Sequence, residues 1–326
     1  MAEGAGQTGG VQLVTVGENN DGQRLDNFLI ARLKGVPRSW VYRVLRRGEV
    51  RVNKGRSKPA RRLQAGDIVR IPPVRQSEKQ AEEPSGSLKG LIEQAICYED
   101  DLIIILNKPA GIAVHGGSGL SHGVIEILRA SRPDAPYLEL AHRLDRETSG
   151  CLMLAKRRSA LRRLQELQRD GQIEKRYLAL LAGRSRKGAW RVDAPLKKNT
   201  LMSGERIVRV DPEGKPAVTH FKVVQRFTDA LLVDVRLETG RTHQIRVHAQ
   251  SIGTPILGDP KYGDVDANRS LRDLGLRQLF LHAASLRFDW PGKPGGFHIE
   301  APLPKELESV LVALEKHEQE IRTDRV

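Results

Sequence analysis

The chain has 326 residues, which is enough for about two domains, each with a hydrophobic core. Hydrophobic residues make up 39% of it, and no apolar run approaches the roughly 18 residues that a membrane-spanning helix requires, so we expect no membrane association. Lysine and arginine number 54 against 40 acidic residues, and the net charge of +14 favours a polyanionic partner such as a nucleic acid. Aromatic residues reach 4%, which argues against recognition by many stacked bases.

The cysteine and histidine residues predict neither a disulfide nor a metal site. Cys97 and Cys151 both lie in apolar stretches, where we expect small core residues of a protein in a reducing cytoplasm. His115 and His122 flank a glycine-rich segment, but neither has a second ligand at a recognised spacing. Residues 1–10 lack the basic and then apolar pattern of a signal peptide, so we expect a cytoplasmic protein.

A compact module of short helices and small strands is expected over residues 21–75. Apolar residues recur at helical spacing in 22–34 and again in 39–47, where Gly48 is placed to end the second helix. Short strands are expected in two segments, 49–53 and 67–71. The preceding residues, 1–20, are expected to be flexible, although a weak alternation in part of them also allows a strand.

This module is strongly basic. From Arg38 to Arg62 there are ten lysine or arginine residues and a single acid, Glu49. A solvated surface usually mixes both signs, so the one-sided charge favours phosphate contact. The arrangement also resembles the small S-four-like RNA-binding domain of a ribosomal protein, in which the second helix and the following loop lie on RNA. That resemblance implies RNA contacts from basic side chains in these elements: Arg38, Arg43, Arg46, Arg47, Arg51 and Lys54.

A linker and a second domain are expected next. Residues 76–92 contain no aromatic and few apolar residues, which favours a flexible linker. The second domain is expected over residues 93–320. It begins with an apolar run at 102–106, predicted to be a buried strand, and continues into a turning loop at 107–115. Within this loop, Lys108 is a candidate for contact with a phosphate.

One charged loop, residues 142–150 (HRLDRETSG), lies between two apolar segments. Loops held by rigid strands often carry catalytic groups. Asp145 stands between Arg143 and Arg146, and nearby cations favour an ionised carboxylate, which suits nucleophilic attack or proton abstraction. The same spacing is also typical of a surface ion-pair loop, so the loop by itself leaves both interpretations open.

The remaining elements follow from apolar periodicity and turn residues. Tyr177 lies in a predicted strand, where tyrosine is usually a packing residue. Thr242 is a plausible N-cap for a helix that ends near Gly253. The expected segments are a helix at 157–170, strands at 173–182, 217–227, 231–239 and 279–287, a turn-rich loop at 257–263 and a terminal helix at 305–316.

All nine residues of the loop 142–150 resemble the signature loop of the RluA family of RNA pseudouridine synthases. Three further stretches fit the family: 107–115 (NKPAGIAVH), 174–180 (EKRYLAL) and 240–248 (GRTHQIRVH). The similarity is greatest to the RluC type, which acts on large-subunit ribosomal RNA. The resemblance implies an α+β fold, in which a mixed, mainly antiparallel β-sheet with flanking helices and a central cleft forms the catalytic domain, beside the small α/β RNA-binding domain.

The resemblance also implies roles for single residues. Asp145 is the essential catalytic residue, and Arg246 pairs with it. Arg143 fills the gap that a flipped-out base leaves in the RNA. Tyr177 stacks on that base and helps to handle its proton, while Ile245 lies beneath it.

The implied reaction converts uridine to pseudouridine and adds nothing to it, so no cofactor or metal is expected. The expected partner is large-subunit ribosomal RNA, and we expect a monomer. A transfer-RNA substrate, a non-catalytic RNA-binding factor, and a metal-dependent nuclease or glycosidase that uses Glu147 remain as alternatives. Whether Asp145 attacks C1′ or abstracts a sugar proton, and which uridines are modified, stays open.

Overall fold

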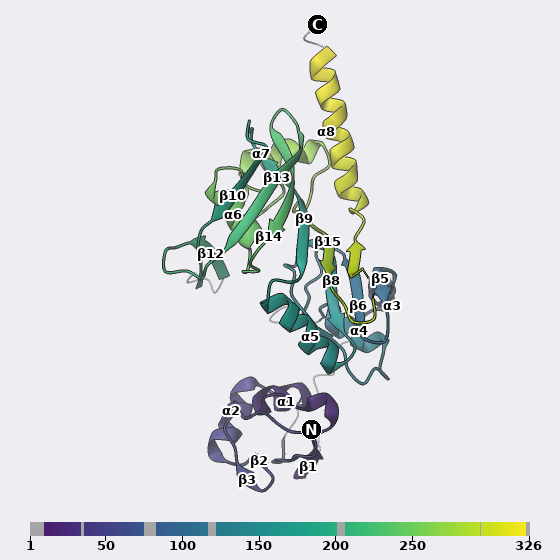
Figure 1. The fold of residues 1–326 in the computed structure, drawn as a ribbon, viewed down its shortest axis with the longest axis vertical. Coiled ribbons are helices and arrows are strands. Elements are labelled where there is room, and N and C mark those ends of the chain that lie inside the picture. Colours follow the sequence, from purple (N-terminus) through teal and green to yellow (C-terminus); the bar gives the residue numbers. More distant parts are fainter. Residues whose placement is uncertain are drawn as a thin grey trace, which may run out of the picture. The chain divides into compact units, whose positions relative to one another are not determined.

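The structure is a computed structural model that describes residues 10–33, 36–74, 83–116, 122–200, 206–293 and 295–323. The chain divides into two compact units, one ending at Glu83 and the other beginning at Pro84. Figure 1 shows the elements of each unit. In the described part of the chain, no helix is long and apolar enough to cross a membrane.

The N-terminal unit packs two helices against a four-stranded sheet of order β1-β4-β2-β3. Its elements are β1 (Gln12–Thr15), the 3-10 helix η1 (Glu18–Asn20), α1 (Leu25–Arg32), α2 (Arg38–Arg47), β2 (Arg51–Val52), β3 (Gly55–Arg56) and β4 (Ile68–Ile71). Helix α2 buries Val41, Val44 and Leu45, whereas its side chains Arg43, Arg46 and Arg47 are exposed. Gly48 ends the helix in a left-handed conformation (φ 71°), as predicted from the sequence.

Two predicted flexible segments need correction. Residues 12–15 form β1, which pairs antiparallel with β4. This confirms the strand that the weak alternation allowed, and the expectation of flexibility for 1–20 is wrong there; residues 1–9 lie outside the described residues. The predicted linker 76–92 is helical from Gly86, where Ser85 caps the helix by accepting a hydrogen bond from the Leu88 amide. Residues 76–82 of that linker also lie outside the described residues.

The C-terminal unit contains a ten-stranded sheet, a two-stranded sheet and six helices in its described residues. The helices are α3 (Gly86–Gln94), α4 (Val124–Ser131), α5 (Arg158–Arg169), α6 (Gln244–Ser251), α7 (Val265–Asp273) and α8 (Lys305–Thr323). The strands are β5 (Ile96–Glu99), β6 (Ile103–Lys108), β7 (Glu139–Leu140), β8 (Ser149–Ala155), β9 (Glu174–Ala182), β10 (Ala189–Asp193), β11 (Leu196–Thr200), β12 (Arg206–Val210), β13 (Val218–Arg226), β14 (Ala230–Leu237), β15 (Leu281–Phe288) and β16 (Phe297–Glu300).

The large sheet has the order β10-β13-β14-β9-β15-β8-β6-β5, with β16 beside β15 and β7 beside β8. Within the described residues its neighbouring strands are antiparallel except for β8 and β15, which run parallel. Gly150 (φ 104°) lies at this parallel contact, where a Cβ atom would come within 2.3 Å of the Ala283 carbonyl oxygen. The predicted α+β fold, with a mixed and mainly antiparallel sheet, is confirmed (Figure 1).

Helices α3 and α4 pack together, and their buried side chains share a core cluster with those of β6, while α5 lies against β8. The sequence patterns did not predict α4 or α7, which follow a glycine-rich and a turn-rich stretch, respectively. Two local predictions are wrong. Thr242 does not cap α6, since His243 holds the N-cap position, and Cys97 is exposed at an irregularity in β5 instead of buried.

Lys108, at the end of β6, does not face RNA as predicted. Its side chain is completely buried (0% exposed), and Nζ donates to the carbonyl oxygens of Pro109 (2.7 Å), Ile112 (2.9 Å) and Arg146 (3.0 Å). Three acceptors match the three N–H groups of an ammonium, although burial lowers the pKa of Lys108 to about 7. Lys108 therefore joins the loop after β6 to the charged loop that carries Asp145.

We expect Lys108→Met to lower the free energy of unfolding by about 3 kcal/mol, because it leaves the carbonyl groups of Pro109, Ile112 and Arg146 without their shared donor. Denaturant unfolding of the full chain measures this change. Lys316→Met, at an exposed position of α8, is the matched control and should leave stability unchanged. Equal stability of the two variants would show that Lys108 does not hold the loops together.

Candidate active site

A cavity of about 1210 Å³ opens beside the parallel pair β8 and β15 in the C-terminal unit. Its wall includes the charged loop, the start of β9, the end of β14 and the beginning of α6. Its volume exceeds the roughly 300–1,000 Å³ typical of small-ligand sites, so it has room for more than one nucleotide. Asp145, Tyr177, Ile245 and Arg246 all line it, although they come from three separate stretches of the sequence.

The loop that carries Asp145 is fixed at both ends by β7 and β8. The Thr148 amide donates to the Asp145 carbonyl oxygen (3.2 Å), which closes a turn within the loop. At the end of the turn, Ser149 Oγ hydrogen-bonds to His282 Nδ1 of β15 (2.9 Å). Together with Lys108, these contacts hold the loop on the sheet and leave the Asp145 side chain 24% exposed to the cavity.

The cation that contacts Asp145 is Arg246, as the resemblance predicted, and not Arg146, its neighbour in the sequence. Arg246 Nη1 of α6, 101 residues further along the chain, lies 3.3 Å from Asp145 Oδ2. The Arg146 side chain instead donates to the Gly111 carbonyl oxygen (2.9 Å) and pairs with Glu147 (3.3 Å). Arg143 is exposed and lines the cavity, which is compatible with contact to RNA.

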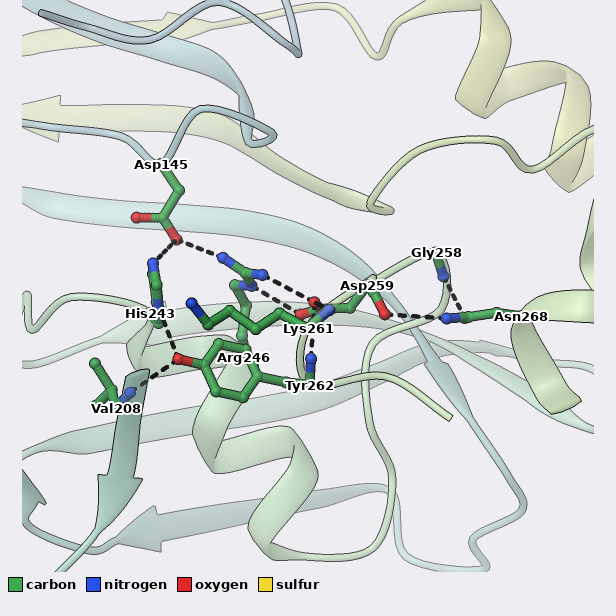
Figure 2. Close-up of polar contacts among 9 residues, drawn as sticks. All are labelled: Asp145, Val208, His243, Arg246, Gly258, Asp259, Lys261, Tyr262 and Asn268. Atoms are coloured by element: carbon green, nitrogen blue, oxygen red, sulfur yellow. Dashed lines mark hydrogen bonds and ion pairs between the residues drawn. The ribbon is translucent and has the colours of Figure 1, made fainter. Parts of the chain in front are cut away.

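Asp259 holds Arg246 from the side opposite Asp145 (Figure 2). Its two carboxylate oxygens accept from Arg246 Nε (2.7 Å) and Nη2 (2.8 Å), and Oδ1 also accepts from the amides of Lys261 and Tyr262. Burial opposes the charge of both groups. The hydrogen-bonded pair nevertheless keeps the pKa of Asp259 below its usual range and raises the pKa of Arg246.

The sequence predicted a turn at 257–263 and gave no role to Asp259. The Arg246 side chain is only 6% exposed, and a buried arginine requires a carboxylate partner. The need for Asp259 therefore follows from the burial of Arg246, which the structure shows. Asn268 reinforces the turn, because its Oδ1 accepts from the Gly258 amide (2.7 Å) and its Nδ2 donates to the Asp259 carbonyl oxygen (3.0 Å). The bidentate geometry fixes the plane of the guanidinium and therefore the direction in which Nη1 points.

Tyr177 and Ile245 form apolar parts of the cavity wall. Tyr177, from β9, is 8% exposed, and Ile245, from α6, is 4% exposed. Burial and the charge of Asp145 raise the pKa of Tyr177, so its hydroxyl stays protonated at neutral pH. An aromatic ring and an aliphatic side chain near a carboxylate suit a planar, uncharged ring such as a nucleobase.

The predicted RNA-binding residues of the N-terminal unit lie on its surface where their side chains are described. Arg43, Arg46 and Arg47 are exposed on α2, and Arg51 and Lys54 are exposed in the hairpin that follows. The side chain of Arg38 lies outside the described residues. Among the residues that the structure describes, no group of three histidine, cysteine, aspartate or glutamate residues could hold a metal ion.

Comparisons with known proteins agree with this geometry. A sequence model of the family described as RNA pseudouridylate synthase matches residues 102–251, and the S4 domain matches residues 23–69. The ribosomal large subunit pseudouridine synthase C of Pasteurella multocida is 55% identical over 306 residues, covering 93% of this chain and 94% of that protein. Its namesake in Escherichia coli K12 is 54% identical over 312 residues, covering 94% and 98%.

Among solved structures, that of the human RNA Pseudouridylate Synthase Domain Containing 4 matches with a TM-score of 0.59 and 29% identity, covering 70% of this chain and 96% of that one. The relatives in Pasteurella and Escherichia are more than 50% identical to this chain, and the alignments cover nearly all of it. The chain therefore belongs to the RNA pseudouridylate synthase family, and its N-terminal unit contains an S4 domain.

Proposed function

We propose that this enzyme isomerises specific uridines of large-subunit ribosomal RNA to pseudouridine. The observation that carries the proposal is the Asp145 carboxylate, which is held by Arg246 at the edge of a cavity lined by Tyr177 and Ile245. The names of relatives that align over almost the full length support ribosomal RNA as the substrate. We further propose that the enzyme works in the cytoplasm and as a monomer.

The reaction breaks the N1–C1′ bond of uridine and forms a C5–C1′ bond. A base within structured RNA is out of reach, so the target nucleotide must first leave its stack. In the proposed mechanism Asp145 then attacks C1′ or abstracts a sugar proton, and the free base turns against Tyr177 and Ile245. After the new bond forms, C5 loses its proton and N1 gains one, so no atom is added to the RNA overall.

Each remaining residue has a role in this mechanism. Arg246 orients the Asp145 carboxylate by donating to Oδ2, and Asp259 fixes Arg246. Arg143, exposed at the cavity, occupies the space in the RNA from which the base has left. The S4 domain adds phosphate contacts through the exposed basic side chains of α2 and its following hairpin.

Asp145→Asn should lower the rate of pseudouridine formation by a factor on the order of 10⁴, because the neutral amide can neither attack C1′ nor accept a proton. RNA binding should persist. Tritium release from C5-labelled uridine, in large-subunit ribosomal RNA and in transfer RNA, measures the activity and separates the two substrates. Asp134→Asn, at an exposed loop position, is the control. Tritium release by the Asp145 variant at the wild-type rate would remove Asp145 from the reaction.

Asp259→Asn should lower kcat by a factor on the order of 100, since an amide nitrogen would face the guanidinium and shift Arg246 away from its position beside Asp145. The KM for RNA should change little, because Asp259 is buried behind Arg246. Steady-state kinetics measure both constants. Asp266→Asn, exposed on the neighbouring α7, serves as the control. A loss that appears in KM alone would contradict a role in orienting Arg246.

The double variant Arg43→Gln and Arg46→Gln should bind RNA more weakly and with less dependence on salt. If both side chains contact phosphates, the slope of log K against log salt concentration falls by about 1.5. Affinity measured across a salt series gives this slope. Lys305→Gln with Lys316→Gln on α8 removes the same charge and is the control. Equal slopes in the two double variants would argue against phosphate contact by α2.

A further inference from the structure

His243 occupies an unusual position between Asp145 and Tyr262. It is the N-cap residue of α6 and has a left-handed backbone (φ 55°, ψ 20°), which is disfavoured for a residue with a Cβ atom. Such strain persists when surrounding contacts hold the residue in place, and it occurs often at functional sites. The side chain is 17% exposed and lines the cavity.

The two nitrogens of the His243 ring face different partners (Figure 2). Nδ1 lies 2.7 Å from the hydroxyl oxygen of Tyr262, and Nε2 lies 3.9 Å from Asp145 Oδ2. The first distance is that of a strong hydrogen bond. The second is longer than a hydrogen bond, but catalytic hydrogen bonds are often long in the free enzyme and shorten when substrate binds.

Tyr262 is itself fixed on all sides. It is 2% exposed, its amide donates to Asp259 Oδ1 (3.0 Å), and the Arg246 guanidinium carbon lies 4.9 Å from the centre of its ring. Its hydroxyl oxygen accepts a hydrogen bond from the Val208 amide of β12 (3.0 Å). The hydroxyl group is therefore held in one place, with a defined partner on each side.

The positions of the protons follow from these contacts. A backbone amide can only donate, so the Tyr262 oxygen is an acceptor toward Val208. Burial raises the pKa of Tyr262, so the hydroxyl stays protonated and can donate a hydrogen bond to His243 Nδ1. Burial also lowers the pKa of His243, although the Asp145 charge opposes this, so the ring is neutral at neutral pH. A neutral ring that accepts at Nδ1 carries its proton on Nε2.

We propose that Tyr262 is a positioning residue that fixes His243 in the Nε2–H tautomer, so that the ring presents a hydrogen-bond donor to Asp145 Oδ2. Arg246 approaches the same oxygen. Figure 2 shows the other carboxylate oxygen turned away from both groups. The pair of donors therefore orients Asp145 with one oxygen held and the other directed to the substrate. The opposite tautomer would place a lone pair against the carboxylate and repel it. This inference rests on the proposed function of Asp145.

A matched pair of substitutions at His243 separates this role from a structural one. His243→Gln places an amide donor near the position of Nε2, whereas His243→Asn reaches no further than Nδ1. Asparagine is the better residue for a left-handed backbone. We expect the glutamine variant to have a kcat about tenfold above that of the asparagine variant, the effect of one charge-assisted hydrogen bond. A purely structural role predicts the reverse order, and that order would overturn the proposal.

Tyr262→Phe tests the other half of the pair, because it removes the hydroxyl and keeps the ring beneath Arg246. We expect kcat for tritium release from large-subunit ribosomal RNA to fall about tenfold with KM unchanged. The same substitution in the His243→Gln background should have no further effect on kcat, since a glutamine has no tautomer to fix. Equal kcat losses in both backgrounds would show that the hydroxyl acts through stability or packing and would reject the proposal.

Nitrogen NMR of the histidine-labelled full chain observes the tautomer without any assay of activity. The His243 signals are assigned by their loss in His243→Gln. In the wild type we expect a protonated Nε2 and an unprotonated Nδ1, and in Tyr262→Phe a mixture of the two tautomers. A proton on Nδ1 in the wild type would overturn the inference. Inactivity of the wild type on every RNA would instead reject the proposed function and leave the NMR result intact.

Discussion

The site depends on the buried guanidinium of Arg246, which lies between two carboxylates. Asp259 binds it in a bidentate manner from behind, and Nη1 extends forward to Asp145. A buried charge of this kind is tolerable because Asp259 carries the opposite charge and accepts two of its hydrogen bonds, and the same pairing fixes the direction of the guanidinium. These contacts require fixed relative positions of three segments: helix α6, the turn that carries Asp259 and the loop that carries Asp145. The folded sheet sets those positions.

The sheet and Lys108 fix the position of the loop that carries Asp145. The charged loop enters β8 where this strand runs parallel to β15, and Gly150 permits the close approach of the two strands. Lys108 joins the loop after β6 to the charged loop through three carbonyl groups. Lys108, predicted from its place in a turning loop to contact a phosphate, instead holds the charged loop that carries Asp145.

The sequence predicted much of the fold and of the site, and its failures have physical causes. The sequence patterns found helices α1, α2, α5, α6 and α8 and the module with the S4 domain. They missed α3, α4 and α7, which lie in or follow linker-like, glycine-rich or turn-rich stretches. Motif resemblance predicted the contact of Asp145 with Arg246, 101 residues apart. It did not predict Asp259 or Tyr262, because their roles come from a tertiary turn. The buried state of Lys108 likewise depends on two loops that meet only in the fold.

The most direct test of the account is a crystal structure of the Asp145→Asn enzyme bound to its target segment of large-subunit ribosomal RNA. The account predicts a target uridine out of its stack, with C1′ about 3.5 Å from the side chain of residue 145 and the base between Tyr177 and Ile245. Arg246 should remain paired with Asp259. A target uridine that stays within the RNA helix, or that binds away from this cavity, would contradict the account.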